Sequence, residues 1–288
     1  DLGGDVTTTT TQTYGGAVTL SGGTRTLAGT TVTFNNTLDG AQALQVTGNA
    51  AFNGRVGGTT DLTSITVTGN ASLNNDIDTT GIQHYGNDAT ADVVTLATNV
   101  ALVGSTITFT SDIQGTVGTE TLGITGNVDF DGEVGDFNSS GDTVIDDLTV
   151  SGNLLFDGTI DNVADVLAGS ATINGQVVAD SFNVTGNTTL AANVTTTTTQ
   201  TYGDAGADAT TLGAGVTLTG SIVTFNSALD GSEALVVTGA AVFNGRVGGL
   251  TDLDAITVSG GATTLNNDID TTGNQTYTAT TLGGDVTL

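Results

Sequence analysis

Apolar and polar residues alternate along most of the chain in short runs that end at a glycine. SITVTG at 64–69 and DLTVSG at 147–152 are clear examples, and a period of two is typical of a half-buried β-strand. A Gly-Asn pair follows in many copies, and we expect it to turn the chain because both residues tolerate turn backbone. The pattern then predicts a second short strand that directs a Phe or Leu, and next a Val or Ile, inward.

The same alternation recurs as the motif V-[TS]-G-N-x-x-[FL]-[ND]-G-x-[VI]. Copies are VTGNAAFNGRV (46–56), ITGNVDFDGEV (124–134) and VSGNLLFDGTI (150–160). A longer segment, 32–58, returns at 223–249 with 20 of 27 positions identical. Sequence that recurs this closely marks a structural unit, so the fold is predicted to be a repeat architecture.

Successive copies of the motif are mostly 17 to 26 residues apart, which suits one rung of a parallel β-solenoid. Equivalent residues of a solenoid stack directly on one another, so geometry explains why the sequence recurs. A β-sandwich gives no such reason. We therefore predict an all-β parallel β-helix of about 14 rungs of roughly 20 residues each, with an apolar core and hydrogen-bonded ladders of stacked Asn at the turns.

No run of Pro, Ser or like charges divides the chain into domains. The sequence predicts a single continuous solenoid over 1–288, built from three higher-order modules at approximately 1–85, 86–202 and 203–288. Its last residues, TLGGDVTL (281–288), restart the pattern of the first, DLGGDVT (1–7). Neither end shows a capping pattern, and a bare solenoid end exposes a strand edge that invites pairing. We expect the edge at Leu2 and Val6 and the edge at Leu282 and Val286 to act in assembly, through copies that stack end to end or through a longer rod.

The composition supports the predicted β-solenoid and excludes some classes of binding partner. The chain has 43 Gly, 27 Asp and only three Glu, and it lacks Pro, Cys, Met, Trp and Lys, which favours strands and turns over helices. With three Arg, the formal charge is -27, so nucleic acid and anionic membrane surfaces are poor partners. No apolar run approaches the ~20 residues of a membrane span. Without an initiator Met or a signal peptide, the chain is expected to be a processed product or a fragment.

The candidate metal ligands are acidic pairs in the repeated segment LNNDIDTTG. Asp76 with Asp78, and Asp268 with Asp270, flank an inward Ile, so each pair presents two carboxylates on one outer face. Such a pair offers a loose Ca²⁺ site. A solvated acidic face is the favoured interpretation, and the sequence indicates no other cofactor and no catalytic residue.

Other recurrent residues are interpreted as structural. The four Tyr occupy one slot of the repeat, which predicts rings at the core edge with their hydroxyl groups at the surface. Arg55 and Arg246 occupy equivalent positions, and Glu133 replaces them in the middle copy, which indicates an exposed turn with a local salt bridge. The Thr runs at 7–11 and 195–199 are typical of exposed β-surface.

The rung motif, the Gly/Asn/Thr/Asp-rich composition and the near absence of Lys, Cys and Met resemble secreted bacterial adhesins. The closest classes are filamentous haemagglutinin-like and autotransporter-passenger-like β-helical repeat proteins. The resemblance covers essentially the whole chain and is one of pattern. It implies a right-handed parallel β-helix, exported to the bacterial cell surface and used in adhesion, a biofilm matrix or extracellular filaments.

The leading hypothesis is a non-enzymatic extracellular structural protein, a segment or subunit of a surface fibre or adhesin that self-assembles. Its expected partners are further copies, flanking repeats of a longer chain, and host or matrix glycans. One alternative is a carbohydrate-active β-helix enzyme, a polysaccharide lyase or hydrolase, with an Asp cluster in loops around 135–147 and 161–171. Another alternative is an ice-binding protein that uses the Thr runs.

Overall fold

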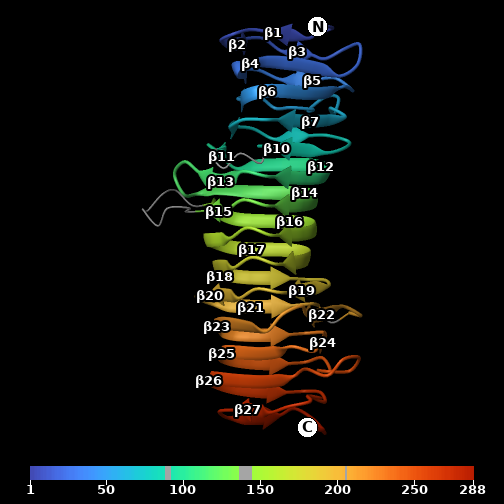
Figure 1. The fold of residues 1–288 in the computed structure, drawn as a ribbon, viewed down its shortest axis with the longest axis vertical. Coiled ribbons are helices and arrows are strands. Elements are labelled where there is room, and N and C mark those ends of the chain that lie inside the picture. Colours follow the sequence, from blue (N-terminus) through green and yellow to red (C-terminus); the bar gives the residue numbers. More distant parts are fainter. Residues whose placement is uncertain (88–91, 136–144, 205) are drawn as a thin grey trace. The chain divides into compact units, whose positions relative to one another are not determined.

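The structure, a computed structural model, describes residues 1–87, 92–135, 145–204 and 206–288. The chain is an all-β parallel solenoid of about 13 turns, drawn in Figure 1. The described residues form 28 strands and no helix. The predicted all-β parallel solenoid is therefore confirmed, with about 13 turns where about 14 were expected.

The chain divides into two compact units, Asp1–Gly152 and Asn153–Leu288, and each is described here by itself. The prediction of one continuous domain with three modules stays a prediction. The strands before residue 152 are β1 (Val6–Thr7), β2 (Thr11–Tyr14), β3 (Val18–Thr19), β4 (Arg25–Phe34), β5 (Leu38–Asp39), β6 (Ala43–Phe52), β7 (Ser64–Val67), β8 (Ala71–Leu73), β9 (Ile77–Asp78), β10 (Gln83–Tyr85), β11 (Val93–Leu96), β12 (Val100–Phe109), β13 (Asp112–Gly115), β14 (Glu120–Phe130) and β15 (Val134–Gly135).

Strand β16 (Ile145–Phe156) contains residue 152, the last residue of the first unit. The strands that follow are β17 (Ile160–Ile173), β18 (Val177–Val184), β19 (Thr188–Leu190), β20 (Val194–Thr196), β21 (Thr199–Tyr202), β22 (Ala209–Leu212), β23 (Val216–Phe225), β24 (Ala228–Asp230), β25 (Ala234–Phe243), β26 (Ala255–Leu265), β27 (Gln275–Tyr277) and β28 (Thr280–Leu282).

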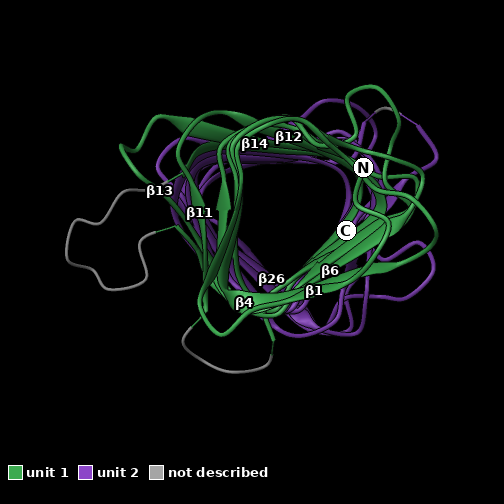
Figure 2. Ribbon diagram, turned by 90° about the horizontal axis from the view of Figure 1, so that it is seen from above, with its two compact units in different colours: residues 1–152 green, residues 153–288 purple. Residues whose placement is uncertain are grey.

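The long strands bend at a glycine where the sequence predicts a turn. Strand β6 continues through Gly48, whose φ of 115° lies in the left-handed region that favours Gly. A Cβ on Gly48 would collide with the carbonyl oxygen of Gly29 in the neighbouring strand β4. The register between β4 and β6 shifts at this bend, between Ala28 and Thr31. Bent strands of this kind give the first unit its three-sided outline, shown in green in Figure 2.

The core consists of identical or similar apolar residues stacked in register. Phe34 pairs with Phe52, whose rings lie 5.7 Å apart at an interplanar angle of 1°. The equivalent pair in the second unit, Phe225 and Phe243, has a ring separation of 5.4 Å. All four side chains are fully buried, so parallel pairing brings equivalent residues of successive turns together, as the recurrence predicts.

Asparagine ladders run beside these stacked rings. Asn53 Nδ2 donates to Asn35 Oδ1 at 2.8 Å, and Asn74 Nδ2 donates to Asn53 Oδ1 at 2.6 Å. The second unit repeats the arrangement with the members Asn226, Asn244 and Asn266, at 2.9 and 2.6 Å. The predicted Asn ladders are confirmed at these turns, where each amide satisfies its neighbour along the stack.

Candidate functional site

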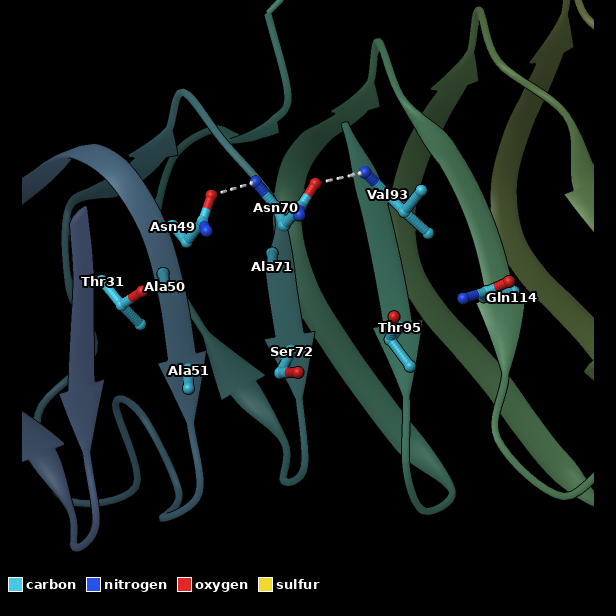
Figure 3. A pocket seen from close by; sticks show the side chains of 10 residues that line it. All are labelled: Thr31, Asn49, Ala50, Ala51, Asn70, Ala71, Ser72, Val93, Thr95 and Gln114. Atoms are coloured by element: carbon cyan, nitrogen blue, oxygen red, sulfur yellow. Dashed lines mark hydrogen bonds between the residues drawn. The ribbon is translucent and has the colours of Figure 1, made fainter. Parts of the chain in front are cut away.

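A shallow groove of about 440 Å³ lies on the outer surface of the first unit (Figure 3). Strands β4, β6, β8, β11 and β13 and the turns beside them contribute to it. It is lined by Thr31, Asn49, Ala50, Ala51, Asn70, Ala71, Ser72, Val93, Thr95 and Gln114. Among the described residues, the lining contains no charged and no aromatic side chain, so its polar groups are amides and hydroxyls.

Two of these asparagines already hold the solenoid together. The backbone N–H of Asn70 donates to Asn49 Oδ1 at 3.0 Å, and the N–H of Val93 donates to Asn70 Oδ1 at 2.8 Å. Figure 3 shows these bonds as a chain that crosses successive turns. Each amide oxygen therefore satisfies a backbone donor at the corner, which gives the Asn of the Gly-Asn motif a structural role.

The predicted calcium ligands bind other parts of the protein. Asp78 Oδ2 accepts from Arg55 Nη2 at 2.7 Å, and Asp76 Oδ1 accepts from the backbone N–H of Ala101 at 2.9 Å. The hydrogen bond to Asp78 is the main cause of a raised Arg55 pKa. The expected salt bridge is thus present, and calcium at Asp76 and Asp78 stays a prediction.

The second acidic pair is arranged in the same way. Asp270 accepts from Arg246 at 2.6 Å, and Asp268 Oδ1 accepts from the N–H of Thr287 at 2.8 Å. Within the residues that the structure describes, neither acidic pair belongs to a cluster of three metal-ligating side chains. The carboxylates act as caps and ion-pair partners in this geometry, and calcium at Asp268 and Asp270 likewise stays a prediction.

A hydrogen-bonded Gln–Tyr pair recurs in four segments of the pattern [VI]-x-T-T-x-x-Q-x-Y, which we call the Gln–Tyr corners. They span 6–14, 77–85, 194–202 and 269–277. In each corner the Gln Nε2 donates to the carbonyl of the Val or Ile six residues earlier, at 3.0 to 3.2 Å. The Tyr hydroxyl donates to the Gln Oε1 at 2.8 to 3.1 Å.

These corners correct the prediction that the Tyr hydroxyls lie at the surface. Tyr85 and Tyr202 are fully buried, and burial raises the pKa of both phenols. Tyr277 is only partly covered, and burial raises its pKa to about 12. Since a buried hydroxyl needs a partner, the Gln supplies one. The sequence analysis missed this structural role of the Gln, although the Gln stands two residues before the Tyr in all four segments.

Glu120 is a second buried polar residue that the sequence did not single out. Its side chain is 2% exposed, and burial alone would raise the pKa of the carboxyl. Hydrogen bonds from the Thr116 hydroxyl and from backbone N–H groups of the loop 116–119 outweigh that effect and lower the pKa to about 2. The carboxylate thus organises the loop, whose Val117 is exposed.

The loops and Thr runs expected for the alternative functions have other structures. Residues 161–171 lie within strand β17 and form no loop, so that part of the hydrolase prediction is wrong. In the other predicted loop, residues 136–144 lie outside the described residues. The Thr run at 7–11 is divided between β1 and β2, with a corner between them, and the run at 195–199 is divided between β20 and β21. Neither run forms one flat array.

Among the described residues, three of the four residues of the predicted assembly edges pair with a residue of a neighbouring turn. Leu2 forms a parallel bridge with Leu20, and Val6 pairs with Leu27. Leu282 pairs with Leu265 and is 55% exposed, whereas Leu265 is fully buried. Val286, after β28, is partly exposed. An apolar position that is buried in an inner turn, at Leu265, is therefore exposed to solvent in the last turn, at Leu282. A role of these edges in assembly stays a prediction.

Comparisons of the chain with protein-family models, with curated proteins and with solved structures find no match. Among the described residues, no helix is long and apolar enough to cross a membrane.

Proposed function

We propose that this chain is a non-enzymatic structural protein of the bacterial cell surface, a segment of an extracellular fibre or adhesin stalk. One observation carries the proposal: the recurrent polar residues bond to neighbouring turns of the solenoid. Examples are Asn53 in its ladder and Gln83 in its corner. Sequence that recurs within one chain for stacking favours a mechanical role over a chemical one, because equivalent turns repeat the same contacts.

A structural role also accounts for the composition. Parallel, in-register strands satisfy the backbone hydrogen-bond donors and acceptors and bury a continuous apolar core. A formal charge of -27 keeps the surface hydrated and repels unrelated anionic molecules. The runner-up, a carbohydrate-active enzyme, is less favoured because Asp78 and Asp270 are engaged with Arg. The ice-binding alternative is less favoured because both Thr runs bend around a corner.

Location is the direct test of this proposal. Antibodies raised against the purified 288-residue chain are applied to intact and to permeabilised cells of the producing organism, followed by gold labelling and electron microscopy. We expect labelled filaments or a labelled surface on intact cells. Labelling that requires permeabilisation would overturn the extracellular role.

Assembly through the strand edges is the second element of the proposal. Sedimentation of the purified chain over a wide concentration range, with and without Ca²⁺, is expected to show reversible end-to-end species. The double substitution Leu282→Asp with Leu2→Asp places charges at both edges and is expected to abolish them. Leu250→Asp is the matched control, because Leu250 is 90% exposed on a turn away from either edge. A wild-type chain that stays monomeric would remove self-stacking.

Glycans of the host or of the matrix are the further proposed partners, and the groove of the first unit is the place to test them. Its amide and hydroxyl lining suits a neutral, hydroxyl-rich polymer. Ala51→Trp would fill the groove from an outward position of β6. Retention on immobilised neutral glycans is expected to fall in this variant, and retention equal to that of the wild type would exclude the groove.

A further inference from the structure

The central asparagine of each Asn ladder is followed by a glycine. Asn53 precedes Gly54, and Asn244 precedes Gly245, in two copies of the sequence FNGRV. Both Asn side chains are exposed to solvent. An Asn-Gly pair is chemically labile, because the main-chain nitrogen of the Gly attacks the Asn side-chain amide without obstruction from a Cβ. The two ladders therefore contain a sequence that is prone to deamidation.

The close stacking of turns requires this glycine. A Cβ at Gly54 would collide with the main chain of Asn36, and a Cβ at Gly245 would collide with the main chain of Ser227. The neighbouring turn cannot move away without losing its register. The solenoid therefore excludes the larger residues that would slow the reaction at these two positions.

The ladder holds each central side chain from both sides. Asn53 Nδ2 donates to Asn35 Oδ1 at 2.8 Å, and Asn53 Oδ1 accepts from Asn74 at 2.6 Å. The ladder of Asn244 has the same two bonds. Deamidation must turn the amide carbon of Asn53 toward the nitrogen of Gly54 in the same turn, and it removes the Nδ2 that donates to Asn35. A closed ladder therefore protects the amide, and the reaction requires local opening.

The reaction needs only water as a co-reactant. The Gly54 nitrogen loses its proton to solvent and bonds to Asn53 Cγ, while the side-chain nitrogen takes up a proton and leaves as ammonia. Water then opens the cyclic imide at either carbonyl. One opening gives aspartate, and the other gives isoaspartate, in which the main chain runs through the side-chain carboxyl carbon and gains one carbon atom. Each conversion adds one negative charge to the formal charge of -27.

An aspartate at the ladder position is compatible with stacking. Asp157 follows a buried Phe and precedes a Gly, as Asn53 does. Its Oδ1 accepts from Asn174 Nδ2 of the next turn at 2.6 Å. A carboxylate at position 53 is therefore expected to keep the bond from Asn74.

An isoaspartate at the same position is incompatible with the closed turn. Phe52 pairs with Phe34 on one side of Asn53, and Val56 pairs with Leu38 on the other. The segment between them thus spans two positions that are fixed by the neighbouring turn. An additional main-chain atom shifts one of these registers and moves an inward side chain out of its stack.

We propose that Asn53 and Asn244 are deamidation sites whose conversion is controlled by their ladders. Opening of a turn permits the reaction, and the isoaspartate that forms prevents the turn from closing again. The modification is non-enzymatic and irreversible, so it marks a turn that has opened. The inference goes beyond the proposed function and does not depend on it, because it follows from the ladder bonds and the Asn-Gly pairs alone.

Peptide mapping by mass spectrometry tests the protection. The full 288-residue chain is kept in a mildly alkaline buffer, with and without urea at a concentration that unfolds it. We expect Asn53 and Asn244 to convert at similar rates in urea, and at least about tenfold more slowly in the folded chain. Conversion of both residues as fast in the folded chain as in urea would overturn the proposal.

A variant of the first ladder tests whether the side-chain bonds give this protection. Asn35→Ala with Asn74→Ala removes both partners of Asn53 and leaves Asn53 and Gly54 in place. Asn244 is the internal control, because its ladder in the same molecule is unchanged. We expect the folded chain to convert Asn53 about fivefold or more faster relative to Asn244 than the wild type does. A general loss of stability would accelerate both residues, and an unchanged ratio of the two rates would overturn the proposal.

Refolding tests the effect of the isoaspartate. After conversion in urea, the chain is diluted into buffer and digested briefly with a protease, and the surviving molecules are analysed at position 53. We expect isoaspartate to be depleted from the survivors and aspartate to be retained. Asn53→Asp is the matched control, which carries the carboxylate without the additional main-chain atom, and it is expected to resist the protease as the wild type does. Equal survival of the isoaspartate form would overturn the proposed block on closure.

Discussion

The Gln–Tyr corners at 194–202 and 269–277 lie in the same unit and share one pattern, yet they differ in burial. Tyr202 is fully buried between Val184 of β18 and Phe225 of β23, whereas among the described residues Tyr277 pairs only with Val258 of β26. Both keep the same bond from the Tyr hydroxyl to the Gln. The local sequence therefore determines the internal bonds of a corner, and the adjacent turn determines its burial.

Truncation of the Tyr to Ala in each corner is expected to show the largest difference in stability between the two corners. Tyr202→Ala removes a fully buried ring stacked on Phe225 and is expected to cost about 3–5 kcal/mol of unfolding free energy. Tyr277→Ala is expected to cost about 1 kcal/mol, because its side chain is already partly exposed to solvent. Urea unfolding followed by circular dichroism measures both. Equal losses would mean that the stack above Tyr202 adds no stability.

The glutamine gives the next largest contrast. Gln200→Ala leaves Val194 O, Thr219 O and the Tyr202 hydroxyl without the partner they have in the buried corner, at an expected cost of about 2–3 kcal/mol. Gln275→Ala is expected to cost about 1 kcal/mol, because water can reach the groups it leaves.

The control for the glutamine variants is a substitution of the residue between the Gln and the Tyr. Thr201→Ala alters an outward, partly exposed residue of β21 and is expected to change the unfolding free energy by less than about 0.5 kcal/mol. If Gln200→Ala were no more damaging than Thr201→Ala, the buried hydrogen bonds of the corner would contribute nothing measurable.

Recurrence explains which parts of this structure the sequence predicted. Stacking of Phe34 on Phe52 and the ladder at Asn53 follow from equivalent residues one turn apart, so the pattern predicted both. Burial of Gln200 did not follow, because Gln is usually exposed and its second acceptor, Thr219, lies on the next turn. To predict such contacts between turns, one must know which residues of successive turns lie opposite each other, and the alternation of apolar and polar residues does not give this register.

The Asp prediction shows the same limit. Asp78 looked like a free outward carboxylate, and its partner Arg55 lies 23 residues earlier in the sequence. The repeated segment contained the information, since Arg246 precedes Asp270 by 24 residues. Two residue types that keep nearly one turn of separation in both copies indicate a contact between turns. The bend at Gly48 was harder to predict, because it depends on close approach to the Gly29 carbonyl.

Alkaline titration of the tyrosines is expected to distinguish the two corners by a smaller effect on stability. Tyr277 has a pKa of about 12 in the folded protein, raised by burial from the ordinary value near 10. Because the folded state binds this proton more tightly, the associated stability is fully present below pH 10 and is lost as pH rises from about 10 to about 12.

Phenolate absorbance against pH measures this titration. Tyr277→Phe should remove a step near pH 12, whereas Tyr202→Phe should leave every step below unfolding unchanged, because burial raises the Tyr202 pKa further. A step near pH 12 that persists in Tyr277→Phe would contradict the assignment.

Removal of the hydroxyl alone is the finest contrast between the corners. Tyr202→Phe keeps the stacked ring and deletes only the donor to Gln200 Oε1, which lies 2.8 Å away in a buried site. We expect a loss of about 1 kcal/mol, since the amide oxygen is left without that donor. Tyr277→Phe deletes a 3.0 Å bond beside solvent, and water can replace the donor there, so the expected loss is about 0.5 kcal/mol or less. Matched urea unfolding curves measure the difference. A larger loss of unfolding free energy at Tyr277 would show that coverage of Tyr202 by β23 does not control the strength of this bond.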